Sequence, residues 1–204
     1  MDAINRTDFR VSGGATSDST YQAPRMDAGT HTLMTIDYAH HEIHAGSSFM
    51  CSATDTDLDI GQLLNITFTT PASTLGYCHM FVNGSCTSSA LFEVLEAPTV
   101  TANSGTPLAV YNRNRASSAV TGCKSIATVP ISGATLTSTV TVGGTVIVSE
   151  GIGVGKNFGA SSTRNDGEII LKAATVYVFR ITGVADNGLA GIFLSWYEHI
   201  NKEA

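Results

Sequence analysis

The stretch TVYVFRITGVADNGLAGIFLSWYEH, from Thr175 to His199, decides the fold. It contains two runs rich in β-branched and aromatic residues, Thr175–Thr182 and Gly191–His199. The segment Ala185–Gly188 (ADNG) between them has the composition of a turn. The stretch therefore predicts two consecutive β-strands.

Similar runs continue towards the N-terminus, and most end at a turn signal. They are Gln62–Thr70 (followed by Pro71), Tyr77–Val82, Leu91–Leu95, Thr137–Val142, Thr145–Ser149 and Glu168–Leu171. Asn83-Gly84 predicts a hairpin after the second run, and Gly143-Gly144 predicts another between the fourth and the fifth. Because turns recur about every ten residues and no crossover helix is evident, the chain predicts an all-β, antiparallel sandwich or barrel.

The two ends of this β-rich region have similar compositions. Strand character begins with Thr32–Ile43, and both Asp37–His44 and Ser195–His199 are aromatic, acidic and rich in histidine. Such residues pair favourably across neighbouring strands. The first and last strands of a jelly roll lie side by side, so we expect a jelly-roll-like β-sandwich in which these two segments pair.

Residues 1–30 show neither strand nor helix periodicity and cannot bury enough apolar surface to fold alone. Two domains are therefore expected: an extended N-terminal arm, 1–30, and the jelly-roll β-sandwich, 31–204. The arm is either a disordered tail or a segment that orders on a partner. Its apolar side chains, Ile4, Phe9 and Tyr21 among them, are candidates for that contact.

Composition excludes several classes of function. The net charge is −6, and eleven Lys and Arg residues form no cluster of the kind that neutralises nucleic-acid phosphates. The N-terminus lacks the apolar core of a signal peptide, and no apolar run is long enough to span a membrane. We expect a soluble, non-secreted chain with no nucleic-acid or membrane partner. Its four cysteines, in no metal-binding spacing, are expected to be buried thiols.

The histidines suggest a metal site as the less favoured of two interpretations. On a strand His40 and His44 would share one face, while His41 would point the other way, and His199 could lie nearby. Pairing of these imidazoles with carboxylates, or a place at a subunit contact, is the favoured interpretation.

Three further motifs fail on inspection. Asp55–Asp59 lacks the glycine and the glutamate of a calcium-binding EF-hand loop, which favours an acidic turn between strands. Gly151–Asn157 departs from the Walker pattern at both ends, and no GxSxG is present. We therefore predict no enzyme activity, catalytic residue, bound metal or cofactor. Arg113 and Arg115 suggest a loop anchor or an interface contact to a carboxylate.

Short motifs in one order resemble a family of tailed-bacteriophage proteins. They are Tyr38–Gly46 (YAHHEIHAG), Phe68–Pro71, Leu91–Glu93, Tyr111–Arg115, Glu168–Lys172 and Ser195–His199. Over about residues 35–200 the chain resembles the capsid decoration, or cement, proteins. The resemblance implies a jelly-roll homotrimer that clamps neighbouring major capsid subunits on the outer surface of the virion, after synthesis in the host cytoplasm.

The scarcity of charge agrees with this expectation. Between Gly61 and Ser149 the charged residues are Glu93, Glu96, Arg113, Arg115 and Lys124. Obligate interfaces are more apolar than ordinary surface, so we expect neighbouring subunits to cover much of this region. The candidate interface residues are Ile4, Phe9, Tyr21, His40, His44, Arg113, Arg115, Trp196 and His199.

Two alternatives stay open. A head-fibre or tail host-recognition module would bind glycans through an exposed patch containing Trp196, Tyr197 or loop aromatics. A cupin-type enzyme would need about three histidines and a carboxylate converging inside the barrel, to which His40, His44 and His199 could contribute.

Overall fold

The computed structural model describes residues 38–101, 104–126, 133–137, 143–153, 158–159 and 167–199. The predicted arm, with Ile4, Phe9 and Tyr21, lies outside the described residues, and so does the segment 31–37. None of the described helices is long or apolar enough to cross a membrane.

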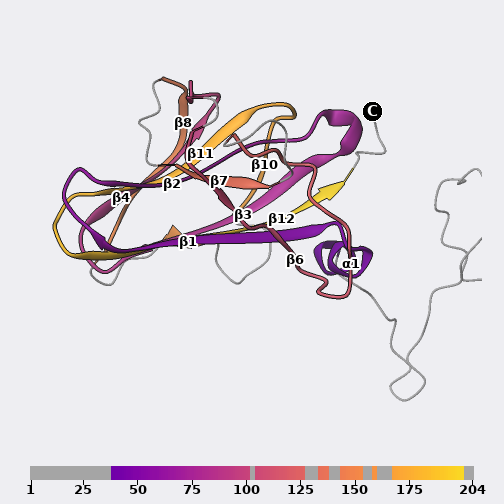
Figure 1. The fold of residues 1–204 in the computed structure, drawn as a ribbon, viewed down its shortest axis with the longest axis horizontal. Coiled ribbons are helices and arrows are strands. Elements are labelled where there is room, and N and C mark those ends of the chain that lie inside the picture. Colours follow the sequence, from indigo (N-terminus) through magenta and orange to yellow (C-terminus); the bar gives the residue numbers. More distant parts are fainter. Residues whose placement is uncertain are drawn as a thin grey trace, which may run out of the picture. The chain divides into compact units, whose positions relative to one another are not determined.

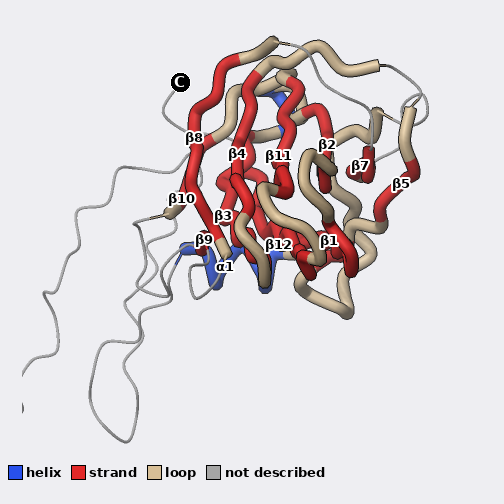
Figure 2. The backbone as a smooth tube through the Cα atoms, turned by 90° about the vertical axis from the view of Figure 1, so that its left-hand side faces the viewer, coloured by secondary structure: helices blue, strands red, loops and turns tan. Residues whose placement is uncertain are grey.

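Two antiparallel six-stranded sheets make up the described structure. The first sheet has the order β10-β3-β12-β1-β6, with β9 also paired to β3, and the second has the order β5-β7-β2-β11-β4-β8. The first contains β1 (Ser48–Leu58), β3 (Tyr77–Cys86), β6 (Tyr111–Asn112), β9 (Phe158–Gly159), β10 (Glu168–Ile170) and β12 (Gly188–His199). The second contains β2 (Leu63–Thr69), β4 (Ala90–Glu96), β5 (Thr106–Leu108), β7 (Ala134–Thr137), β8 (Thr145–Ile152) and β11 (Val176–Gly183). Figure 2 shows the strands of the second sheet side by side in this order.

The core lies between the two sheets, as the alternation of side chains in the strands requires. Phe49 and Trp196 from the first sheet meet Phe68 and Phe179 from the second, and all four are buried. The Trp196 ring centroid lies 6.0 Å from that of Phe49 and 5.8 Å from that of Phe68. The prediction of an all-β, antiparallel sandwich is therefore confirmed.

The first and last strands lie side by side, but the strand that pairs with β12 is β1 rather than the predicted segment Asp37–His44. No predicted strand covers Ser48–Leu58. β1 pairs with β12 from Ser48 opposite Tyr197 to Leu58 opposite Gly188. Figure 1 shows both strands running along the same layer. Successive strands β1, β2, β3 and β4 alternate between the two sheets, so the neighbours in sequence face one another across the core.

The predicted strand Thr32–Ile43 is wrong where the structure describes it, because Tyr38–Ala45 forms the helix α1. The helix ends at Gly46, whose φ is +78°. The Gly46 N–H donates to the Ile43 carbonyl and the Ser47 N–H donates to the Glu42 carbonyl, both at 3.1 Å. This pair of hydrogen bonds is the Schellman motif, which needs a residue in the left-handed conformation and therefore favours glycine. A second short helix, η1, spans Ser73–Leu75.

The hairpin predicted at Asn83-Gly84 is also wrong, because β3 runs through both residues. Gly84 lies opposite Ile192 of β12 and is buried facing the core. A Cβ atom at Gly84 would lie 2.7 Å from Cδ2 of Phe92, on the facing sheet. The glycine is therefore explained by close packing across the sandwich rather than by a turn.

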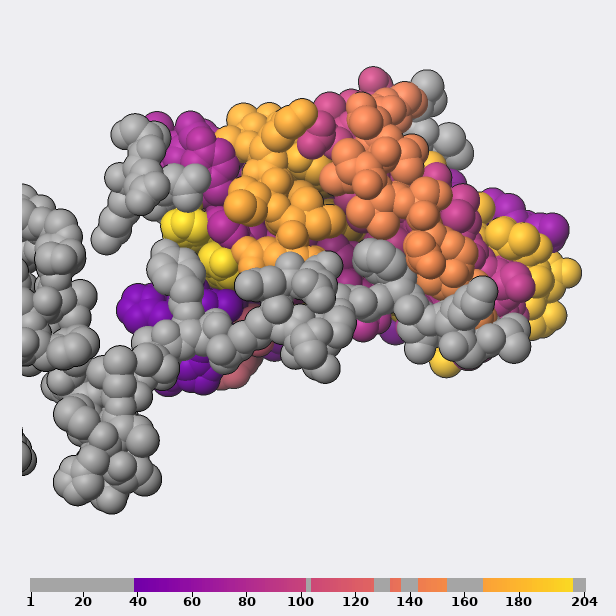
Figure 3. Space-filling model, turned by 180° about the vertical axis from the view of Figure 1, so that it is seen from behind, coloured from indigo at the N-terminus to yellow at the C-terminus, as the bar shows by residue number. Residues whose placement is uncertain are grey.

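The hairpin predicted around Gly143-Gly144 falls partly on residues 138–142, which lie outside the described residues. The strand that follows it, β8, pairs with β4 from Ala90 opposite Ile152 to Glu96 opposite Thr145. Val146 is 48% exposed and Ile147 38%, and Figure 3 shows β8 (orange) at the surface.

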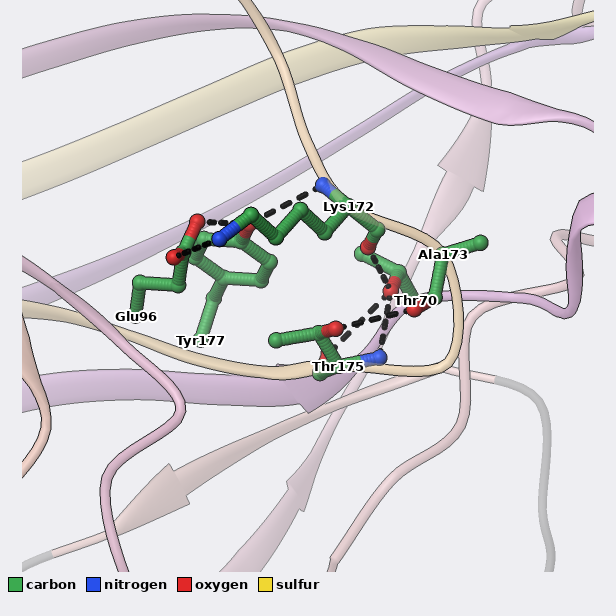
Figure 4. A network of polar contacts seen from close by, with 6 residues as sticks. All are labelled: Thr70, Glu96, Lys172, Ala173, Thr175 and Tyr177. Carbon is green, nitrogen blue, oxygen red and sulfur yellow. Dashed lines mark hydrogen bonds and ion pairs between the residues drawn. The ribbon is translucent and has the colours of Figure 1, made fainter.

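A network of polar contacts holds the turn between β10 and β11 (Figure 4). The Thr70 hydroxyl lies 2.6 Å from the Lys172 carbonyl oxygen and accepts a hydrogen bond from the Thr175 N–H at 2.9 Å. The Lys172 ammonium and the Tyr177 hydroxyl donate to separate oxygens of the Glu96 carboxylate, at 2.6 and 2.7 Å. These hydrogen bonds from Lys172 and Tyr177 lower the pKa of Glu96.

This lowered pKa predicts an acid-dependent loss of stability. The charged form of Glu96 is favoured in the folded state, so its contribution is complete above the ordinary glutamate pKa of about 4.3 and is lost as the pH falls through the lower, folded-state pKa. Because Lys172 is mostly exposed, we expect a loss of at most about 1 kcal/mol. Urea unfolding of the wild type, Glu96→Gln and the exposed control Glu150→Gln, at neutral and acidic pH, measures it. Only Glu96→Gln should flatten the pH dependence, and an unchanged slope in that variant would contradict the assignment.

Candidate functional site

The side of the first sheet that faces away from the core carries an unusual surface, here called the outer face. Most of its residues are opposite one another in the register, and Leu189 shares the side of Phe193 through the alternation along β12. The outer face comprises Met50, Ser52, His79, Phe81, Asn83, Tyr111, Glu168, Ile170, Leu189, Phe193, Ser195 and Tyr197. Among these residues Glu168 is the only acidic one, and none is a lysine or an arginine.

Large apolar side chains on the outer face are open to solvent. Ile170 is 58% exposed, Leu189 51%, Tyr111 50% and Phe193 45%. Large apolar side chains exposed on one side of a sheet indicate a candidate site of interaction. The outer face is therefore the candidate functional site, and its chemistry suits packing against another apolar surface.

The Glu168 carboxylate is hydrogen-bonded to its neighbours within the outer face. Its Oε1 atom lies 2.5 Å from Nδ1 of His79 and accepts a hydrogen bond from the Tyr197 hydroxyl at 2.8 Å. The rings of His79 and Tyr197 stack with their centroids 4.6 Å apart, and the centroids of His79 and His199 lie 4.4 Å apart. His79 and Tyr197 are buried, and this polar cluster lies near one end of the face, where β1 begins and β12 ends.

Four of the predicted interface residues gather near one edge of the first sheet. His40 and His44 are exposed on α1, with their Nε2 atoms 3.0 Å apart. Residues four positions apart share a face in a helix as they do in a strand, so the two histidines lie together as expected although the element is a helix. The Asn114 side chain donates to the His44 carbonyl at 3.2 Å, which places the loop containing Arg113 and Arg115 beside the helix.

Both arginines of this loop are exposed and contact residues of the first sheet. The Arg115 guanidinium lies over the Tyr111 ring, 5.0 Å from its centroid, and Nη1 of Arg113 lies 3.5 Å from the Ser48 hydroxyl oxygen. Tyr111 in turn is opposite Met50 on the outer face. The loop therefore extends the candidate surface beyond β6.

The interface prediction is wrong for Trp196, which is 1% exposed and belongs to the core. His199 is partly buried, and its ring packs on that of His79. Its role at an interface stays a prediction. The residues that sequence reasoning missed are Phe193, Leu189 and Ile170, because a strand pattern alone does not say which of its two faces is covered.

The acidic segment Asp55–Asp59 lies partly in β1 rather than wholly in a turn. Oδ1 of Asp55 accepts the Asp57 N–H at 3.0 Å, and Oδ1 of Asp59 accepts the Asn187 N–H at 3.1 Å. Across the same region Oδ1 of Asp186 accepts the Ile60 N–H at 3.0 Å. The Asp59 and Asp186 carboxylates therefore connect the turn after β1 to the turn before β12.

One cluster within the described part of the chain has the donor atoms to hold a metal ion: Cys78, Cys123 and Glu198. The two Sγ atoms lie 3.5 Å apart, and Sγ of Cys123 lies 3.7 Å from Oε1 of Glu198. Burial raises the pKa of the Cys123 thiol well above its ordinary value, and the neighbouring Cys78 raises it further. All four cysteines are free and buried, which confirms the prediction of buried thiols.

Comparison with known proteins found no matching family model, no matching curated protein and no matching solved structure.

Proposed function

We propose that this protein is a structural component of a virion, a decoration or cement protein that binds the outer surface of a bacteriophage head as a homotrimer. Its partner is the major capsid protein, and it acts without a catalytic site, cofactor, nucleic acid or membrane. The observation that carries the proposal is the outer face, which exposes Leu189, Phe193 and Ile170 and whose one acidic residue is Glu168. The proposed trimer and the proposed capsid partner rest on the resemblance of the short motifs to those of decoration proteins.

The strand order supports a jelly roll as the framework of this protein. Eight strands make up the framework, with β10-β3-β12-β1 in the first sheet and β2-β11-β4-β8 in the second. In chain order they alternate between the sheets except at β4 and β8, which are paired neighbours in the second sheet. The chain enters at β1 and leaves at its neighbour β12. A double-sheet arrangement of eight strands in this alternation is what the jelly-roll interpretation requires.

The two alternatives are less well supported by the positions of their key residues. A glycan-binding patch was expected around Trp196 and Tyr197, and both side chains are buried. A cupin-type site would bring histidines together inside the sandwich, whereas His40 and His44 are exposed on α1. We therefore carry forward the assembly function alone.

Placing a carboxylate on the outer face is expected to break the trimer. Phe193→Asp would bury an unpaired charge in the subunit contact, which costs several kcal/mol and weakens association by at least about 100-fold. Sedimentation equilibrium should find the wild type as a trimer and Phe193→Asp as a monomer. Val120→Asp is the matched control, because Val120 is 74% exposed and is not on the outer face.

Binding to expanded phage heads tests the capsid partner separately. Wild-type protein and Val120→Asp should saturate the heads, and Phe193→Asp should not. A wild-type protein that is monomeric at all concentrations and does not bind heads would overturn the proposed function. A trimer that binds an immobilised glycan instead would favour host recognition.

A further inference from the structure

We propose that Cys78, Cys123 and Glu198 form a site for one zinc-class divalent ion. The three residues come from β3, from the segment before β7 and from β12, and their donor atoms all lie within 4.8 Å of one another. Two thiolates and a carboxylate are ligands that Zn²⁺ takes readily. This site is separate from the outer face and does not depend on the proposed function.

Two of the three separations between the donor atoms match a tetrahedral ion. With Zn–S bonds of about 2.3 Å and Zn–O bonds of about 2.1 Å, two sulfurs are about 3.8 Å apart and a sulfur and an oxygen about 3.6 Å apart. The observed separations are 3.5 Å between the sulfurs and 3.7 Å between Sγ of Cys123 and Oε1 of Glu198. The third separation, between Sγ of Cys78 and the Glu198 carboxylate, is within 4.8 Å.

The Glu198 carboxylate is already fixed in place by donors of the chain. Oε2 accepts the Gly122 N–H at 2.8 Å, and Oε1 accepts the indole N–H of Trp196 at 2.9 Å and the Thr121 hydroxyl. The Thr121 hydroxyl also accepts the Cys123 N–H at 3.1 Å, which positions the second ligand. Hydrogen-bonded ligands of this kind orient a metal site before the ion arrives.

Binding would replace the thiol protons of Cys78 and Cys123 by the ion, and both protons would leave to solvent. Three protein ligands leave one coordination position for water, and Glu198 is only half-buried. The ion would join β3, β12 and the segment around Cys123, adding to the hydrogen bonds to Glu198 and the bridge between Thr69 and Lys124.

Cobalt titration of the reduced, untagged, full-length protein tests the site, because thiolate ligands give intense charge-transfer absorption in the near ultraviolet. We expect one Co²⁺ per chain with this absorption and with the strong visible bands of a four-coordinate ion, displaced by Zn²⁺. Cys123→Ser and Glu198→Gln should each weaken binding by at least about tenfold. Cys51→Ser and Cys86→Ser remove buried thiols outside the cluster and should bind as the wild type does.

The wild-type zinc complex provides a test that needs no variant to fold. X-ray absorption at the zinc edge should find two sulfur neighbours at about 2.3 Å and oxygen at about 2.0–2.2 Å. A first shell of nitrogen and oxygen alone, as His40 and His44 would supply, overturns the proposal. A thiol count on the protein as isolated that finds two free thiols rather than four also overturns the proposal, because Cys78 and Cys123 would then form a disulfide.

Discussion

Replacing Trp196 with Ala is expected to lower the free energy of unfolding by about 3–5 kcal/mol. The indole is 1% exposed and fills the space between the sheets, where it contacts the rings of Phe49 and Phe68. Its removal leaves a cavity that surrounding strands cannot close, and Glu198 loses the N–H donated at 2.9 Å. Thermal unfolding should show a midpoint lower by about 10 °C or more.

The matched control is Leu75→Ala, because Leu75 is a large apolar side chain that is 61% exposed. Its unfolding free energy should stay within about 0.5 kcal/mol of the wild type. All proteins must be compared at one concentration, since assembly also stabilises the folded chain. A Trp196→Ala variant within about 1 kcal/mol of the wild type would contradict the packing of the two sheets around this residue.

Replacing Gly84 with Ala is expected to lower the unfolding free energy by about 1–3 kcal/mol, the usual cost of overpacking a core. The new Cβ would lie 2.7 Å from Cδ2 of Phe92 and 3.1 Å from Cε2 of the same ring. Phe92 is 0% exposed and cannot turn into solvent to relieve the clash. Urea unfolding measures the change.

Gly191→Ala is the control for Gly84→Ala, because it lies on the neighbouring strand and meets its nearest atom at 3.6 Å, an ordinary contact. This variant should be as stable as the wild type or slightly more so, since alanine restricts the unfolded chain. Adding Phe92→Leu to Gly84→Ala should recover part of the loss by freeing space across the core. Equal effects of the two glycine replacements would refute the close approach of β3 and β4.

Local patterns predicted most of the long strands correctly. Gln62–Thr70, Thr175–Thr182 and Gly191–His199 differ from β2, β11 and β12 by a few residues at their ends. In these runs β-branched and aromatic residues recur at the positions that the sheet buries, so local strand propensity and tertiary packing favour the same structure. Errors arose where local propensity and tertiary packing favoured different structures.

Two of the errors have a clear physical cause, and the missed strand β1 (Ser48–Leu58) is a third error. Asn83-Gly84 is a strong turn signal, but a glycine is required at position 84 because Phe92 on the facing sheet leaves no room for a Cβ atom. The helix Tyr38–Ala45 is only eight residues long, too short to show a clear helical period. Its end at Gly46 was the signal that could have located it.

The amino-acid sequence by itself determined the class of this protein: an all-β chain of low charge, with its cysteines buried. Those properties follow from composition and from the alternation of side chains, which act over a few residues. Only the tertiary structure decided which strand faces meet the core and which form the outer face, and only it brought Cys78 to Cys123 across 45 residues. Such contacts depend on which strands pair and which sheets pack, because burial is a property of the whole arrangement rather than of any one segment.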